Sequence, residues 1–153
     1  QLGVVSDICG QVLGKTVLPQ AQFVLHADSP VRGVATSGWR GRSFSLGIAD
    51  SVTVLAADAA QADVAATLIA NAVNVSHPAI VRRPAADLRD DTDLGHRLVT
   101  VEVPTLPAQA VRHALDLGLD CARQMQAHGW IHAALLCCQG QVAVADALAC
   151  WME

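Results

Sequence analysis

Residues 51–73 read SVTVLAADAAQADVAATLIANAV, and the spacing of their apolar side chains changes midway. In Ser51–Leu55, valine alternates with hydroxyl residues, a period of two that is typical of a strand covered on one face. From Ala59 onward the apolar residues recur at helical spacing, and Asp58 followed by Gln61 resembles a capping box. The stretch therefore predicts a strand followed directly by a helix that runs from Ala59 to about Val73.

Short apolar runs separated by Gly, Pro and Asp surround this unit. We expect strands at Leu2–Val5, Val12–Val17, Gln22–Ala27, Gly33–Thr36, Ser43–Ile48 and Leu98–Val103, a helix from Pro107 to about His128, and a hairpin of Trp130–Cys138 with Gln141–Val144. Residues 77–96 are expected to be irregular and polar. Strands in runs, interrupted by two helices, predict an α+β fold in one domain over residues 1–153, with an antiparallel or mixed sheet and both main helices on one face.

Composition narrows the class of protein. Of the 153 residues, 52% are hydrophobic and only 16% charged, which suits a chain with a packed core. No apolar run approaches the roughly 18 residues of a membrane span. The net charge of −4 argues against nucleic acid as a partner. The five cysteines have no regular spacing, which indicates reduced thiols in a cytoplasmic protein.

The segment Thr36–Ser43 reads TSGWRGRS and is a candidate anion-binding turn. Its two glycines permit a close approach of backbone N–H groups to a ligand, while Arg40 and Arg42 add cationic donors. A phosphate or carboxylate would suit such a turn. An ordinary glycine-containing β-turn with solvated arginines fits the same residues equally well.

Asp63 and Thr67 form the second candidate site. They are four residues apart, so a helix places them on one face. A carboxylate and a hydroxyl are hard oxygen ligands that suit Mg²⁺ or Ca²⁺. The alternative is a solvated helix face whose Asp lies near the favourable N-terminal end. The acidic segment Asp87–Asp93 lacks the ligand order of an EF-hand and is interpreted as a solvated loop.

Taken in order, GVATSG at residues 33–38, SVTVL at 51–55 and ADVAATL at 62–68 resemble the C-terminal half of the ApbE-type FAD:protein FMN transferases. They are more similar still to an uncharacterised ApbE-like family. The resemblance implies that this chain is the C-terminal half of a larger ApbE-like unit. It also implies that Asp63 and Thr67 bind Mg²⁺, which helps to hold FAD. The turn lies near the flavin site in that family, so the candidate ligand-binding residues are Thr36, Ser37, Gly38, Arg40, Arg42 and Asp50.

The interval Trp39–Asp50 departs from the transferase pattern, because it lacks the histidine and the Asp-Pro-Arg-Thr-Gly-like stretch found there. Three functions stay open. The chain could bind a flavin nucleotide or a similar anionic ligand with a divalent metal, as a transferase whose catalytic residues are not assigned. It could instead be a non-catalytic binding module for a small carboxylated or phosphorylated heterocycle. Thirdly, it could be a structural subunit that completes a site with a second chain or in a homo-oligomer.

Overall fold

A computed structural model describes residues 4–8, 21–25, 28–146 and 151–152. In chain order its elements are β1 (Val4–Ile8), β2 (Ala21–Leu25), β3 (Gly33–Ser37), β4 (Ser51–Ala56), α1 (Ala59–Ala72), β5 (Val81–Pro84), the 3-10 turn η1 (Ala85–Asp87), β6 (Leu98–Glu102), α2 (Ala108–Ala127), β7 (Ala133–Cys138), β8 (Gln141–Asp146) and β9 (Trp151–Met152). The strand expected at Val12–Val17 lies outside the described residues. The expected α+β class is confirmed.

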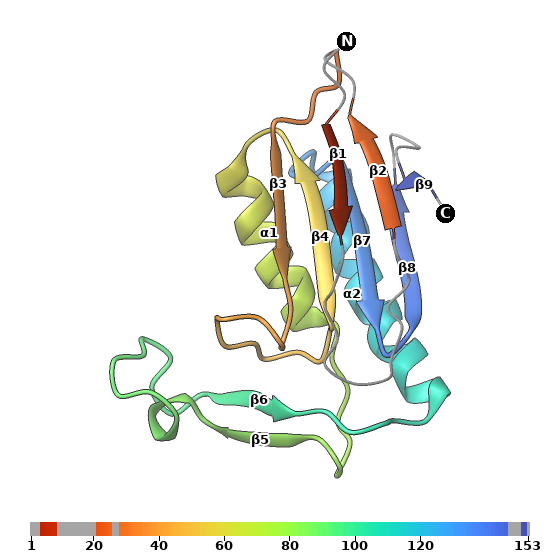
Figure 1. The fold of residues 1–153 in the computed structure, drawn as a ribbon. Helices are drawn as coiled ribbons and strands as arrows, with labels where there is room; N and C mark the ends of the chain where they lie inside the picture. Colours follow the sequence, from red (N-terminus) through yellow and green to blue (C-terminus); the bar gives the residue numbers. More distant parts are fainter. Residues whose placement is uncertain (1–3, 9–20, 26–27, 147–150, 153) are drawn as a thin grey trace.

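The central layer is an antiparallel sheet in the order β3-β4-β7-β8 (Figure 1). Both helices pack on one face of this sheet and against each other, as expected. A second sheet, β1-β2-β9, lies over the other face, where Leu25 packs with Leu55 and Ala133. Beyond one end of the central sheet lies a two-stranded ribbon of β5 and β6 (Figure 1).

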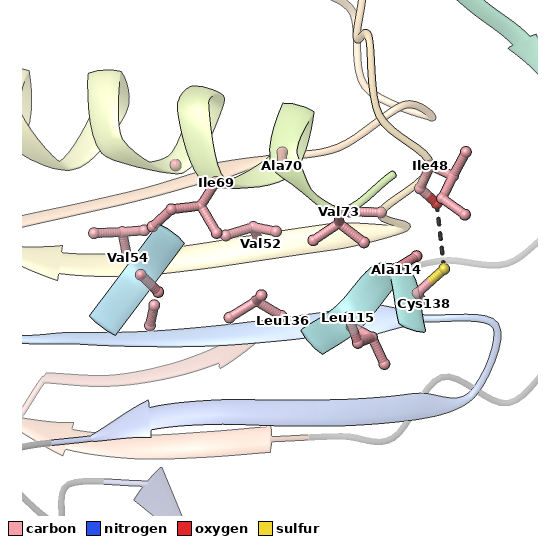
Figure 2. Close-up of a cluster of buried hydrophobic side chains, with 14 of the residues drawn as sticks. Ile48, Val52, Val54, Ile69, Ala70, Val73, Ala114, Leu115, Leu136 and Cys138 are labelled. Carbon is pink, nitrogen blue, oxygen red and sulfur yellow. Dashed lines mark hydrogen bonds between the residues drawn. The ribbon is translucent and has the colours of Figure 1, made fainter. Parts of the chain in front are cut away.

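The main core fills the space between the helices and the central sheet (Figure 2). Val52 and Val54 of β4 belong to this core together with Leu136 of β7, as the period of two predicts. The expectation that only one face of this strand is covered was wrong, because Thr53 and Leu55 on the opposite face are buried as well. The helices approach each other closely at Gly118, where a Cβ atom would lie 2.3 Å from a methyl carbon of Val73. A glycine in mid-helix is unfavourable by itself, so close packing explains its place in α2.

Most local signals for the helices and turns are confirmed. The Asp58 carboxylate caps α1 by accepting a hydrogen bond from Gln61 N at 2.8 Å. Pro107 stands at the N-terminus of α2. The hairpin of β7 and β8 turns at Gln139 and Gly140, which have φ values of 45° and 77°. Both lie in the left-handed region that two-residue hairpin turns require.

Two further expectations were wrong. Ser43–Ile48 is not a strand but part of a loop, residues 38–50, because most of its backbone hydrogen bonds are with residues at the end of α1, and the one from Thr100 N to Ser45 O does not extend into a ladder with β6. Leu46 N donates to Asn71 Oδ1 at 2.9 Å, and Ile48 N donates to Val73 O at 2.8 Å. The segment 77–96 is not wholly irregular, since it contains β5 and η1. The strand β5 reads VRRP, which has no apolar alternation to reveal it.

The described cysteines Cys121, Cys137 and Cys138 are thiols without a disulfide, in agreement with the sequence. Burial raises the pKa of Cys138 from 9.0 to about 12, and the nearby Asp50 charge adds to the effect. The Cys138 thiol donates to Ile48 O at 3.4 Å (Figure 2).

The free energy of unfolding is therefore expected to fall as the pH rises from 9 toward 12. In that window the unfolded chain loses the Cys138 proton and the folded chain keeps it, so the unfolded state gains stability. The sequence has no tyrosine, which removes one common source of alkaline titration. Urea unfolding at several pH values tests this expectation, with Cys138→Ala as the comparison. A slope as steep in Cys138→Ala as in the wild type would contradict it.

Candidate functional site

Loop 38–50 connects β3 to β4 and lies between the end of the central sheet and the β5–β6 ribbon (Figure 1). Its hydrogen bonds to α1 involve the last residues of the helix and those just after it. Asn74 Nδ2 donates to Leu46 O at 3.1 Å, and the Ser45 hydroxyl lies 3.2 Å from Asn71 Oδ1. The loop is thus fixed at its base, while Gly41, Arg42 and Ser43 are exposed.

Among the candidate residues, Arg40 in the turn at the start of this loop forms an ion pair with Asp50. Arg40 Nε lies 3.2 Å from Asp50 Oδ1, with side-chain exposures of 51% for Arg40 and 6% for Asp50. The Arg40 guanidinium also stacks over the Trp39 ring, 4.9 Å from its centroid. A carboxylate below and an aromatic face beside it restrict the orientation of this guanidinium.

Asp50 is itself held in place from a distant part of the chain. Its Oδ2 accepts a hydrogen bond from Gln139 N at 2.6 Å, and its own backbone N donates to Cys137 O at 2.9 Å. The Gln139 side chain in turn donates to Pro104 O at 2.7 Å. Both carboxylate oxygens of Asp50 are therefore engaged, and Asp50 joins the turn at Arg40 to the β7–β8 hairpin.

The glycines give the turn its shape. A Cβ atom on Gly38 would lie 2.3 Å from Asp50 O, so only glycine permits this approach of the two ends of the loop. Gly41 N donates to Gly38 O at 3.1 Å and closes the turn around Trp39 and Arg40. This geometry presents Arg40 and the exposed Arg42 on one short segment.

Two predicted ligand residues in β3 are placed differently from the arginines. Thr36 Oγ1 forms a hydrogen bond of 2.8 Å with Thr53 Oγ1 of β4. Because side chains alternate along a strand, Thr36 points to the face opposite Ala35, which packs against the main core. Ser37 is half-buried at the end of β3, directly before the turn.

The predicted metal ligands Asp63 and Thr67 are both exposed on α1, one turn apart. The helix begins beside Gly33 and ends beside Gly47, and loop 38–50 bonds to its far end. Asp63 precedes Val73 by about 15 Å of helix. Within the described residues, no three His, Cys, Asp or Glu side chains are grouped so as to hold a metal. The metal and a pocket shared with the turn stay predictions.

Sequence reasoning missed two residues of this arrangement, Trp39 as the platform for Arg40 and Gln139 as the anchor of Asp50. Adjacency to Arg40 was the one local signal for Trp39. The signal for Gln139 was its place in the expected hairpin turn, which did not reveal its contact with Asp50.

Comparison with known proteins identifies relatives of this chain. A family model described as "AbpE bacteria" matches residues 6–144. A UPF0280 protein of Methanothermobacter thermautotrophicus is 55% identical over 53 residues, which are 34% of this chain and 20% of the relative. A UPF0280 protein of Methanococcoides burtonii is 32% identical over 74 residues, 48% of this chain and 31% of the relative. The matched segments thus span less than a third of either relative.

These findings correct the resemblance drawn from the sequence. The matching family is described as AbpE bacteria, and both relatives are named UPF0280 proteins, so the expected kinship with the FAD:protein FMN transferases was wrong. No solved structure matches the chain. Among the helices that the structure describes, none combines the length and apolar character needed to cross a membrane.

Proposed function

We propose that this chain, which belongs to the family described as AbpE bacteria, is a binding module for a small phosphorylated or carboxylated heterocycle whose anionic group is held by Arg40. The observation that carries the proposal is the fixed orientation of the Arg40 guanidinium between the Trp39 ring and the buried Asp50 carboxylate. Ordering a side chain is part of the free-energy cost of binding. In this fold, Trp39 and Asp50 already order the Arg40 side chain before a ligand binds.

A guanidinium has five N–H donors, and Nε is the Arg40 atom that lies 3.2 Å from Asp50 Oδ1. The donors on the two Nη atoms lie at the end of a side chain that is 51% exposed. Such a planar fork matches the paired oxygens of a carboxylate or phosphate. The geometry therefore suits recognition of an anionic group at the surface of the turn.

Charge balance assigns a role to Arg42. The Asp50 carboxylate cancels the charge of Arg40, so the pair by itself attracts anions weakly. Arg42 is exposed two residues away, and within the described residues no carboxylate pairs with it. Its charge supplies the net attraction, while Arg40 supplies the geometry.

Flavin mononucleotide and riboflavin are the matched probes, because they share a heterocycle and differ by one phosphate. Calorimetric titration is expected to show saturable binding of flavin mononucleotide and binding of riboflavin weaker by about tenfold or more. Arg40→Gln should weaken flavin mononucleotide binding by a similar factor. Arg112→Gln, which removes an exposed arginine of α2, should leave it unchanged.

Two outcomes would change the proposal. No saturable heat, or equal affinity for the two probes, would contradict recognition of an anionic group. The expected binding survives EDTA. Binding that requires Mg²⁺ and is lost in Asp63→Ala would instead support the metal-assisted site predicted from the sequence.

A further inference from the structure

A second group of polar residues lies where the β5–β6 ribbon meets loop 38–50 and the end of α1. Arg82 of β5 and Thr100 of β6 are partners in the ribbon register, so their side chains lie on the same face. The edge of β6 meets the loop, since Thr100 N donates to Ser45 O at 2.8 Å. We call this group of Arg82, Thr100, Ser45 and Asn74 the ribbon joint.

Arg82 is a half-buried cation in the ribbon joint whose hydrogen-bond partners carry no charge. Its Nη2 donates to Asn74 Oδ1 at 2.5 Å and to Val75 O at 3.5 Å. Across the described residues, no carboxylate forms an ion pair with it. Burial without a counter-charge lowers the pKa of Arg82, as desolvation of a cation does.

Thr100 supplies an independent observation. The residue is only 6% exposed, and its Oγ1 is buried without a hydrogen-bond partner. The neighbouring Ser45 hydroxyl already accepts from Gly47 N and lies against Asn71 Oδ1. A buried hydroxyl without a partner lowers stability, so its presence opposite Arg82, a cation without a counter-charge among the described residues, needs a reason.

We propose that Arg82 and Thr100 form an anion site, distinct from the Arg40 turn, which binds a single phosphate or carboxylate group. The Arg82 guanidinium would supply the charge and paired donors, and the Thr100 hydroxyl would donate a further hydrogen bond. Bound oxygen atoms would satisfy both groups at once. Asn74 and Val75 hold Nη2 on one side, which leaves the donors on Nε and Nη1 for the anion.

The partial negative charge at the C-terminus of α1 does not cancel the attraction of Arg82 for an anion. Arg82 contacts residues that follow directly after the helix, whose C-terminus carries roughly half a negative charge. The guanidinium carries a full positive charge, so the ribbon joint keeps a net positive charge. A role for Arg82 in capping the helix is therefore compatible with an anion beside it.

The test measures the melting temperature of the whole chain in sodium phosphate, sodium acetate and sodium chloride at equal ionic strength. With phosphate about tenfold above its dissociation constant, the wild type is expected to melt about 3–5 °C higher than in chloride. Thr100→Val has nearly the same shape and lacks the hydroxyl. It should fold at least as stably in chloride and lose most of the phosphate shift. The acetate series shows whether a carboxylate suffices.

The variant Arg40→Gln/Arg42→Gln separates this site from the proposed function. It should keep the part of the phosphate shift that Thr100→Val loses, because its substitutions lie outside the ribbon joint. A shift that persists in Thr100→Val, or no shift in the wild type up to 50 mM phosphate (about the highest practical concentration), would overturn the proposal. A shift lost in the arginine variant and kept in Thr100→Val would place the anion at the turn alone.

Discussion

Gly47→Ala is expected to destabilise the protein by about 3–5 kcal/mol, a large share of the roughly 5–15 kcal/mol that holds a typical domain folded. An added Cβ atom would lie 2.0 Å from Ala70 O and 2.8 Å from Val73 O. Both are backbone atoms, which cannot rotate aside as the end of a side chain can. Loop 38–50 would have to leave the end of α1.

The estimate combines two costs. Overpacking of this kind costs about 1–3 kcal/mol, and each lost hydrogen bond about 1 kcal/mol. Of the bonds that join loop 38–50 to the end of α1, the range of 3–5 kcal/mol includes the two made by Leu46, to Asn71 and to Asn74, at about 1 kcal/mol each.

Urea unfolding followed by circular dichroism measures the change. Gly41→Ala is the matched control, because it lies in the same loop and its Cβ would meet only Gly38 O, at 3.1 Å. The control should lose less than about 1 kcal/mol. Equal stability of Gly47→Ala and the wild type would mean that the loop does not pack on α1 as described.

Asp50→Ala is expected to cost about 2–4 kcal/mol. The larger part comes from Gln139 N, whose hydrogen bond of 2.6 Å to a charged oxygen would be lost. Such bonds contribute about 1.5–3 kcal/mol. The pair with the half-exposed Arg40 adds less, because solvent screens it and surface pairs contribute about 0–1 kcal/mol.

The same denaturation assay tests this expectation, with Asp63→Ala as the control for removing a carboxylate. Asp63 is exposed, so its removal should change the free energy of unfolding by less than about 0.5 kcal/mol. Asp50→Asn should fall between the two, since an amide oxygen can still accept from Gln139 N. Equal losses in Asp50→Ala and Asp63→Ala would show that Asp50 does not anchor the turn.

The fold was predictable where local spacing determines the element. The change of period between Ser51–Leu55 and the following helix gave both elements almost to the residue. The strand predicted at Ser43–Ile48 was wrong because its residues alternate as in a strand, while its backbone bonds mainly to residues at the end of α1, among them Asn71 and Val73. The strand β5 was not predicted, because its pairing with β6 is not visible in the sequence VRRP.

The candidate site was predictable as a set of residues but not as an arrangement. Arg40 and Asp50 both belonged to the predicted ligand set, yet their pairing depends on how loop 38–50 folds. The anchor Gln139 lies 89 residues beyond Asp50, and no local pattern reports such a contact. Asp63 and Thr67 share a helix face as predicted, but spacing alone did not show that loop 38–50 bonds to the other end of α1.

The central claim is that Asp50 orients Arg40 for an anionic ligand. A double-mutant cycle on flavin mononucleotide affinity, with Asp50→Asn, Arg40→Gln and both together, tests it most directly. Removing Asp50 also removes a repulsive charge, so any weakening reports lost orientation. We predict that Asp50→Asn weakens binding when Arg40 is present and does not weaken it when Arg40 is replaced. Equal weakening in both backgrounds, or tighter binding in the single variant, would contradict the account.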